Sequence, residues 1–382
     1  MSGGRGARSA NGGTSLRDYL IVLSRAIHAA PELAYQERQA VANIASLLRR
    51  HGHAVELPHG GLETAFRARV GPKGPSVALL AEYDALPEIG HACGHNLIAM
   101  SNVGAFLLAA QRAKDLEVGI ELIGTPAEES GGGKIDLIDT GAFKECVAVL
   151  SSHPGGNTWE FGRSSLGIVG RLVRFHGLAS HAAYSPHQGR NALTAAIRLF
   201  LAVDGWRQHL PADTRVHGII TKGGAASNII PDLAECDFGL RAADLAVLEE
   251  MDATFRRMAE GAAMQTGTTV EIDDKMRLYA PVKPNSRIDA LLLEEFGRRK
   301  IPVEQGGLTL ASTDFGNVSQ VAPADYIGFP VSTESISGHS HVMREASATD
   351  LAHKNAMLTA EMLATVAVRI ATDKAIRASL TA

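Results

Sequence analysis

The sequence predicts an α/β protein: a mostly parallel mixed sheet flanked by helices, with an inserted ferredoxin-like α+β domain. Two observations carry this prediction. First, apolar strand-like runs at 76–84, 118–124 and 146–152 alternate with helical patterns, which is typical of parallel sheets covered on both faces. Second, from Gly167 the order changes to β-α-β-β-α-β, which is the ferredoxin-like plan.

The elements of the first region follow from hydrophobic spacing. Apolar residues recur at helical intervals in two N-terminal segments, and Gly52 ends the second of them. Further helices are expected where apolar patterns fill the gaps between the strands. The helices predicted in this way are 16–28, 35–50, 96–113 and 133–140. Near the C-terminus we expect one more strand at 325–329 and a long closing helix at 350–370.

The second region has its own pattern and ends where prolines return the chain to the first. Its expected strands are 168–176, 215–221, 231–241 and 268–273, and its expected helices are 190–209 and 244–265. Pro281 and Pro284 mark the return. We therefore expect four segments: a disordered leader at 1–14, the two parts of a first domain at 15–166 and 281–382, and an inserted domain at 167–280.

Composition narrows the class of protein. The chain has 382 residues, 45% of them hydrophobic, which is enough for more than one hydrophobic core. Its formal net charge is −4. The mild acidity and the absence of long basic runs argue against a nucleic-acid partner. No apolar run reaches the roughly 18 residues that span a membrane. Three cysteines cannot form a disulfide framework and fit a reducing compartment, so a cytoplasmic enzyme with a small-molecule substrate is expected.

The segment His91–His95 places a thiol and an imidazole two residues apart. Cys93 and His95 are ligands of the type that zinc and similar ions prefer. Alone, such a pair is more often simple packing. In parallel sheets, however, ligands bind beyond the carboxyl ends of the strands. Four more acid-base or metal-competent side chains stand at or just past such ends: Asp84, Glu128, Glu129 and His153. Their convergence indicates metal-dependent catalysis.

Some of these positions have alternative interpretations. Adjacent glutamates do not easily face the same ion, so we expect Glu129 to bind metal while Glu128 moves a proton. The competing explanation is that both are acids in the first turn of a helix. Cys146 and Cys236 lie within strands and are interpreted as packing.

Two pairs of histidines remain ambiguous from the residues alone. His339 and His341 flank Ser340 and are alternatives for a last metal ligand. His181 and His187 straddle an apolar turn in the inserted region, and composition does not say which is functional.

Taken in order, these motifs resemble the aminoacylase and carboxypeptidase-G type of dinuclear metallopeptidases and amidohydrolases. The resemblance covers the chain from about Leu16 onward. It rests on His91–His95, 126–129, 152–154, 180–183, 227–231 and 338–340. Within that family, 81–87, Asn96 and 124–134 resemble the branch of aminobenzoyl-glutamate hydrolases and β-alanyl-lysine dipeptidases. They differ from the usual pattern of hippurate and auxin-conjugate hydrolases.

The resemblance implies a role for each matching residue of the first region. The implied metal ligands are Cys93, His95, Glu129, His153 and His339, with Cys93 replacing the bridging carboxylate of many relatives. Glu128 matches the general base. Asp84 matches the acid that orients the metal shell. The family pattern, a ligand just before Ser or Thr, favours His339 over His341.

The resemblance implies a zinc-exopeptidase-like fold in which 15–166 and 281–382 form the catalytic domain and 167–280 forms a lid and dimerisation domain. In the inserted region, it implies that His181 reaches the active site of a partner subunit and polarises the scissile carbonyl. Asn228 and Arg241 match positions that hold the carboxylate of the substrate. The forked guanidinium of arginine suits that task, although a surface ion pair explains Arg241 equally well. The segment 312–316 resembles a substrate-side loop without an evident role.

These expectations combine into one functional prediction. The protein is expected to be a homodimeric hydrolase with two divalent metal ions per subunit (zinc or manganese, possibly cobalt). Its expected reaction is cleavage of the amide bond of a small N-acyl amino acid or dipeptide-like substrate with a free carboxylate. Two alternatives are hydrolysis of another C–N bond, such as an aryl amine or amidine, and a non-catalytic binding protein on the same scaffold.

Overall fold

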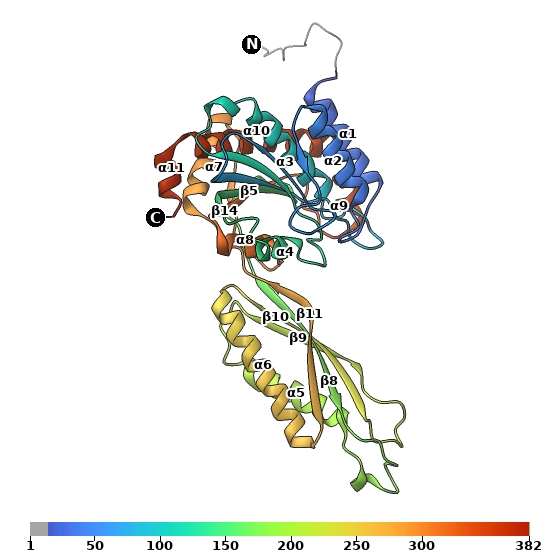
Figure 1. Ribbon diagram of the computed structural model, residues 1–382. Coiled ribbons are helices and arrows are strands. Elements are labelled where there is room, and N and C mark those ends of the chain that lie inside the picture. Colours follow the sequence, from blue (N-terminus) through green and yellow to red (C-terminus); the bar gives the residue numbers. More distant parts are fainter. Residues whose placement is uncertain (1–13, 382) are drawn as a thin grey trace.

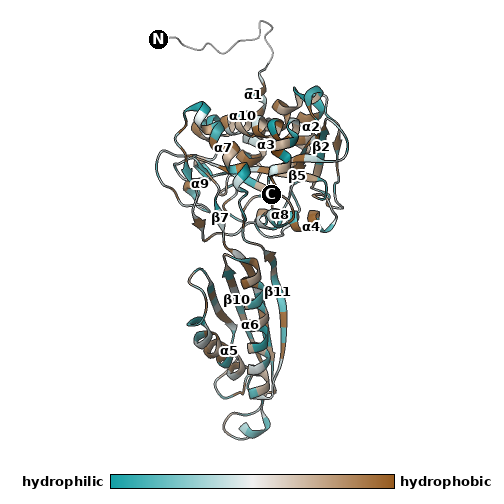
Figure 2. Cartoon of the chain, turned by 90° about the vertical axis from the view of Figure 1, so that its left-hand side faces the viewer, coloured by the Kyte–Doolittle hydropathy of each residue, from teal (hydrophilic) through white to brown (hydrophobic). Residues whose placement is uncertain are grey.

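The computed structural model describes residues 14–381 (Figure 1). Nearly all of the leader predicted at 1–14 therefore lies outside the described residues. Figures 1 and 2 show two bodies, a larger one built of helices around a sheet and a smaller elongated one below it. Within residues 14–381, no helix combines the length and the apolar character needed to cross a membrane.

The larger body is organised around an eight-stranded sheet with the order β1-β2-β4-β3-β5-β14-β6-β12. Its strands are β1 (Val55–Glu56), β2 (Phe66–Val70), β3 (Ser76–Ala81), β4 (Gly119–Gly124), β5 (Cys146–Pro154), β6 (Glu160–Phe161), β12 (Glu304–Gln305) and β14 (Ala324–Phe329). The central strands β4, β3, β5 and β14 are parallel, and β2 is antiparallel to β4. Strands β3 and β4 are buried along their whole length, as parallel strands covered on both faces must be.

Helices cover both faces of this sheet. They are α1 (Leu16–Ala29), α2 (Arg38–Arg50), α3 (His95–Ala110), α4 (Gly133–Asp139), α7 (Ser286–Arg299), α8 (Phe315–Val321), α9 (His341–Ala346), α10 (Asp350–Thr372) and α11 (Lys374–Ser379). Alternate residues of β3 serve the two layers. Val77 and Leu79 belong to the cluster that includes α1, α3 and α10, whereas Ala78 and Leu80 pack with α4 and α8. In Figure 1 the helices α4 and α8 lie on the side of the sheet that faces the smaller body.

The smaller body is a four-stranded antiparallel sheet with the order β11-β8-β10-β9 and two helices on one face (Figure 1). In chain order its elements are β8 (Gly167–His176), α5 (Ala192–Arg207), β9 (Arg215–Lys222), β10 (Leu233–Ala242), α6 (Leu245–Thr266) and β11 (Thr269–Tyr279). Burial alternates strictly along β10, because one face of this sheet packs on the helices. The body has its own hydrophobic core. The predicted fold class, with its β-α-β-β-α-β insertion, is confirmed.

Several details differ from the sequence-based expectation. Strand β3 ends at Ala81, so Asp84 lies in the following loop, and His153 lies within β5 instead of after it. Strand β2 and helices α7, α8 and α9 were not predicted. The remaining short elements are a two-stranded sheet of β7 (Ser164–Ser165) with β13 (Leu308–Thr309), and single turns at η1 (Ala113–Asp115) and η2 (Pro186–Gln188).

Candidate metal-dependent active site

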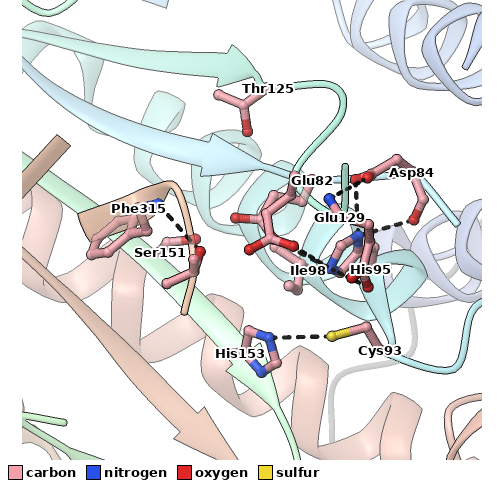
Figure 3. Close-up of polar contacts among 12 residues, drawn as sticks. Glu82, Asp84, Cys93, His95, Ile98, Thr125, Glu129, Ser151, His153 and Phe315 are labelled. Atoms are coloured by element: carbon pink, nitrogen blue, oxygen red, sulfur yellow. Dashed lines mark hydrogen bonds and ion pairs between the residues drawn. The ribbon is translucent and has the colours of Figure 1, made fainter. Parts of the chain in front are cut away.

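The site lies at the carboxyl ends of β3, β4 and β5, where loops bring distant residues together (Figure 3). The loop after β3 carries Cys93 and leads into α3, whose first residue is His95. Between them, Gly94 has a left-handed φ of 78°, and a Cβ there would lie 2.6 Å from Pro154 of β5. Only glycine fits this turn, which presses the ligand loop against the end of β5.

One group of potential ligands joins this loop to β5. The Sγ of Cys93 lies 3.6 Å from Nε2 of His153, and the rings of His153 and His95 meet edge to face. Figure 3 shows the thiol and the imidazole of His153 pointing toward one another. One ligand atom from each of the three residues lies within 4.8 Å of the other two. This spacing fits three ligands of a single ion.

A second group shares Cys93. It joins the thiol to Glu129 and His339, again with all three ligand atoms within 4.8 Å. Oε2 of Glu129 lies 3.5 Å from Nε2 of His339. His339 has a left-handed φ of 52°, and its backbone N–H donates to the carbonyl of Ala92 at 3.0 Å. The structure thus brings His339 into the ligand groups, whereas His341 begins α9 and belongs to none of those found within residues 14–381.

Glu128 lies beside both groups and forms a third with His95 and Glu129, again with one ligand atom from each residue within 4.8 Å of the other two. Its Oε2 is 3.9 Å from Nε2 of His95, and Oε1 of Glu129 is 3.8 Å from the same nitrogen. The two glutamates lie in the loop between β4 and α4, so they are not in the first turn of a helix. Burial, followed by the negative charge of Glu129, raises the pKa of Glu128 well above its usual value. A buried carboxylate of raised pKa is suited to hold a proton transiently.

Asp84 orients two of these side chains at once. Its Oδ1 accepts a hydrogen bond from Nδ1 of His95 at 2.9 Å, and its Oδ2 accepts one from the backbone N–H of Glu129 at 2.9 Å. Burial raises the pKa of Asp84, but the charge and hydrogen bond of His95, the N–H of Glu129 and the charge of Lys134 together outweigh it, so the carboxyl stays ionised with a lowered pKa. Because Nδ1 of His95 is engaged, Nε2 is the nitrogen left for a ligand, which is the usual arrangement in metal sites.

The side chains present fit a pair of divalent cations. Nε2 of His95 and Oε1 of Glu129 are buried and have no hydrogen-bond partner among the described residues. Unpartnered buried polar atoms are costly, and a cation between them would remove that cost. Burial also lowers the pKa of His153 to about 4, which keeps its imidazole neutral and its lone pair available. Thiolate, imidazole and carboxylate together suit zinc, and the oxygens and nitrogens also suit manganese or cobalt.

Three buried charged residues beside the site were missed by the sequence analysis. Nζ of Lys134 lies 2.8 Å from Oε1 of Glu82 and 2.6 Å from Oδ1 of Asp314, and all three side chains are buried. Oε2 of Glu82 lies 3.5 Å from Nε2 of His95. Glu82 follows directly on β3, so its place at a strand end was the one available signal. Nothing in the spacing of Lys134 or Asp314 marks them as partners.

The residues predicted in the inserted region fall into two separate places. His181 and Asn228 lie side by side, because the backbone N–H of Ala182 donates to the carbonyl of Asn228 at 2.9 Å. Both are exposed, and they lie beyond the end of β8 that is remote from the larger body (Figure 1). Ten residues of β8 separate this end from the connection at Gly167, a span of roughly 30 Å. Within one chain they are therefore far from Cys93.

Arg241 lies at the opposite end of the inserted region from Asn228. It pairs with Ile168 at the start of β8, next to the connection. Its Nη1 donates to the carbonyl of Leu310 at 3.0 Å and to Oγ of Ser312 at 2.9 Å. The two residues predicted to bind the substrate carboxylate are therefore not together in one chain, and Arg241 lies on the side of the larger body.

This fold and this site define a class of protein. Two ligand groups that share a thiol, beside a buried glutamate at the carboxyl edge of a parallel sheet, are the arrangement of a metal-dependent hydrolase. Residues 78–363 match the family described as peptidase family M20/M25/M40, and the chain belongs to this family. The protein is accordingly a metallohydrolase acting on C–N bonds.

Individual relatives agree with this assignment. The chain is 37% identical to the Xaa-Arg dipeptidase of Mus musculus over 366 residues, covering 91% of this chain and 84% of that protein. It is 32% identical to one of the p-aminobenzoyl-glutamate hydrolase subunits of Escherichia coli (strain K12), covering 70% of this chain and 60% of that protein. A dinuclear metal-binding M20 peptidase from Bacillus subtilis has the same fold, with a TM-score of 0.71, 20% identity, and coverage of 93% of this chain and 98% of its own. The resemblance predicted from the sequence is confirmed.

Proposed function

We propose that this protein cleaves the amide bond of a dipeptide or a small N-acyl amino acid that carries a free carboxylate, using two divalent cations per subunit. The observation that carries the proposal is the pair of ligand groups that share Cys93 within reach of Glu128. Relatives named as an Xaa-Arg dipeptidase and a p-aminobenzoyl-glutamate hydrolase support an amino acid as the leaving group.

The residues divide the reaction between them. One cation would be held by Cys93, His95 and His153, and the other by Cys93, Glu129 and His339. Bound cations of this kind lower the pKa of water and polarise a carbonyl. Glu128 would accept the proton of the attacking water and deliver it to the leaving nitrogen. Asp84 would keep His95 and Glu129 oriented during the reaction, because it accepts a hydrogen bond from each.

We further propose that 167–280 forms a lid and dimerisation domain, and that 15–166 and 281–382 form the catalytic domain. In a homodimer, the exposed His181 of one subunit would polarise the scissile carbonyl in the site of the other. The distance of this histidine from its own metal ligands supports that arrangement. Strand β9 is at the edge of its sheet and exposes Ile219 and Ile220, at 61% and 39%, so it offers an unpaired edge to a second copy.

The substrate carboxylate would then be held from two sides. Arg241 stands near the connection between the two bodies, and the partner's Asn228 would approach from the lid of the other subunit. A guanidinium can bind both oxygens of a carboxylate at once, which favours substrates with a free C-terminal carboxylate.

The proposal is tested by a substrate screen with defined metals. Dipeptides ending in arginine or lysine, p-aminobenzoyl-glutamate, N-acetyl amino acids and hippurate are incubated with the protein and zinc, manganese or cobalt. Release of a free amino acid, together with two bound metal ions per subunit, is expected. Release of ammonia without an amino acid would instead indicate hydrolysis of another C–N bond. If the protein shows no turnover and binds no stoichiometric metal, it is a binding protein.

A further inference from the structure

Tyr279 is the last residue of β11 and lies where the inserted region rejoins the larger body. Its side chain is buried, and its hydroxyl donates a hydrogen bond to the main-chain carbonyl of Glu128 at 2.8 Å. Ala127, directly before Glu128, has a left-handed φ of 61°, which is a strained conformation for a residue with a side chain. A strained loop needs external contacts to hold it, and the tyrosine hydroxyl supplies one at the catalytic residue itself.

The backbone around Tyr279 is held on both sides by one amide. Oδ1 of Asn317 accepts from the N–H of Ala280 at 3.0 Å, and Nδ2 of Asn317 donates to the carbonyl of Leu278 at 3.0 Å. Next to it, Gly316 packs so closely that a Cβ would lie 1.8 Å from the carbonyl oxygen of Ala280. Helix α8 is therefore fastened to the connection at the point where Tyr279 leaves β11.

The same helix reaches the catalytic loop by a second route. Asp314, just before α8, accepts hydrogen bonds from both the backbone N–H and the ammonium of Lys134 in α4. Helix α4 begins four residues after Glu129. Burying an ion pair costs desolvation free energy, and apolar residues of similar volume often stabilise the folded protein as well or better. A role in fixing α4, and with it the loop of Glu128, accounts for an ion pair at this position.

We propose that Tyr279 is a positioning residue for Glu128. Asn317 fixes the backbone on both sides of Tyr279, and Asp314 fixes α4, which follows the loop of Glu128. This inference rests on the proposed function, because it gives Glu128 the proton-transfer role. The same inference gives a structural role to residues 312–317. The segment ties the connection of the inserted region to the general base, so that the base keeps its place when the lid moves.

The test compares Tyr279→Phe with a matched control, Tyr35→Phe. The hydroxyl of Tyr35 donates to a side chain instead, Oδ2 of Asp136 in α4 at 2.6 Å. The ring of Tyr35 packs against Gly131 of the same loop, and Tyr35→Phe keeps that ring. Loss of the Tyr279 hydroxyl is expected to lower kcat roughly 10- to 100-fold, the effect of a misplaced catalytic group, while KM and bound metal stay unchanged. Backbone amides in 127–133 are expected to exchange deuterium faster. Tyr35→Phe is expected to change none of these quantities.

Asn317→Asp provides a second, nearly isosteric variant. It keeps an acceptor for the N–H of Ala280 and replaces the bond to the carbonyl of Leu278 by a repulsion between two oxygens. It is expected to have a smaller effect of the same kind, and combining it with Tyr279→Phe is expected to add little, because both act through one contact. Wild-type kcat and wild-type deuterium uptake in Tyr279→Phe would overturn the inference. If the wild-type protein hydrolyses no amide, the proposed function fails, yet the deuterium comparison still decides whether Tyr279 holds the loop.

Discussion

The two halves of the proposed active site are built in different ways. The half in the larger body is preformed. Asp84, His95 and Glu128 are buried, the first two on the segment after β3 and the third on the loop after β4, and these adjacent strands are held by the core. The half in the inserted region consists of His181 and Asn228 on exposed loops, about the length of a ten-residue strand away from the connection. Metal ligands need a fixed geometry before the substrate arrives, whereas groups that contact the substrate can arrive with a closing lid or a second subunit.

The packing of the two bodies agrees with this division. The inserted region has a hydrophobic core of its own, separate from the two clusters that cover the faces of the large sheet. The ligand loops are pinned to β5 and to the Ala92 carbonyl by contacts that any movement would break. We therefore expect three kinds of substitution: those that remove bound metal, those that lower kcat and leave the metal in place, and those whose lost activity a second subunit restores.

The largest effect is expected from Cys93→Ala. Because both ligand groups contain this thiol, its loss is expected to remove both cations and all activity. His339→Ala is expected to remove one cation only. Metal content measured by plasma mass spectrometry distinguishes these outcomes, and Cys146→Ala, a cysteine outside both groups, is the control. Retention of two cations by Cys93→Ala would contradict the shared-ligand geometry.

Glu128→Gln is expected to keep its metal and lose its chemistry. General acid–base catalysis contributes about 10²- to 10⁴-fold, so kcat should fall by that order while metal content is unchanged. Steady-state kinetics and metal analysis on the same preparation make the measurement. Loss of a cation in this variant would show that Glu128 is a ligand, and the roles of the two glutamates would have to be exchanged.

His181→Ala is expected to lower kcat by the equivalent of roughly 3–4 kcal/mol, the usual value of a donor to a developing oxyanion. We expect His181 of one subunit to act in the active site of the other. Mixing His181→Ala with Glu128→Ala should then restore about a quarter of wild-type activity, because half of the randomly formed dimers have one complete site. No recovery after mixing and reassociation would place His181 in its own subunit's site or outside catalysis.

The smallest effect is a pH dependence of metal affinity. Burial, followed by the charge of Glu129, raises the pKa of the Cys93 thiol to about 12 in the metal-free protein. At neutral pH the thiol is therefore protonated, and a cation must displace that proton. Affinity is expected to rise with pH, by about tenfold per pH unit for each proton released. Competition with a chelator across the neutral range measures the slope, and a flat profile would show that the thiol does not bind.

The sequence was informative wherever function and strand order coincide. Cys93, Glu128 and His153 were predicted to converge because parallel strands present their carboxyl ends at one edge, and the structure places them there. Strand β2 escaped prediction because its arginines interrupt a short apolar run, and α8 because it is short and contains glycine and asparagine. Such elements form through tertiary contacts more than through local preference.

The remaining parts of the site depend on geometry that no local pattern encodes. Lys134 and Asp314 are 180 positions apart in the chain, and their pairing follows only from the packing of α4 against α8. The separation of Asn228 from Arg241 likewise depends on the direction in which β10 runs. The same is true of Tyr279, whose contact with Glu128 joins two segments that the sequence shows only as a strand end and a loop.

The inserted region enters and leaves the larger body at neighbouring points, since Ile168 and Tyr279 are register partners in adjacent antiparallel strands. A few ångströms separate such partners, so a very short linker could bridge the gap if the whole insertion were excised. Excision would also remove Arg241 and the hydrogen bond of Tyr279 to Glu128, so such a variant would separate what the larger body does alone from what the insertion adds.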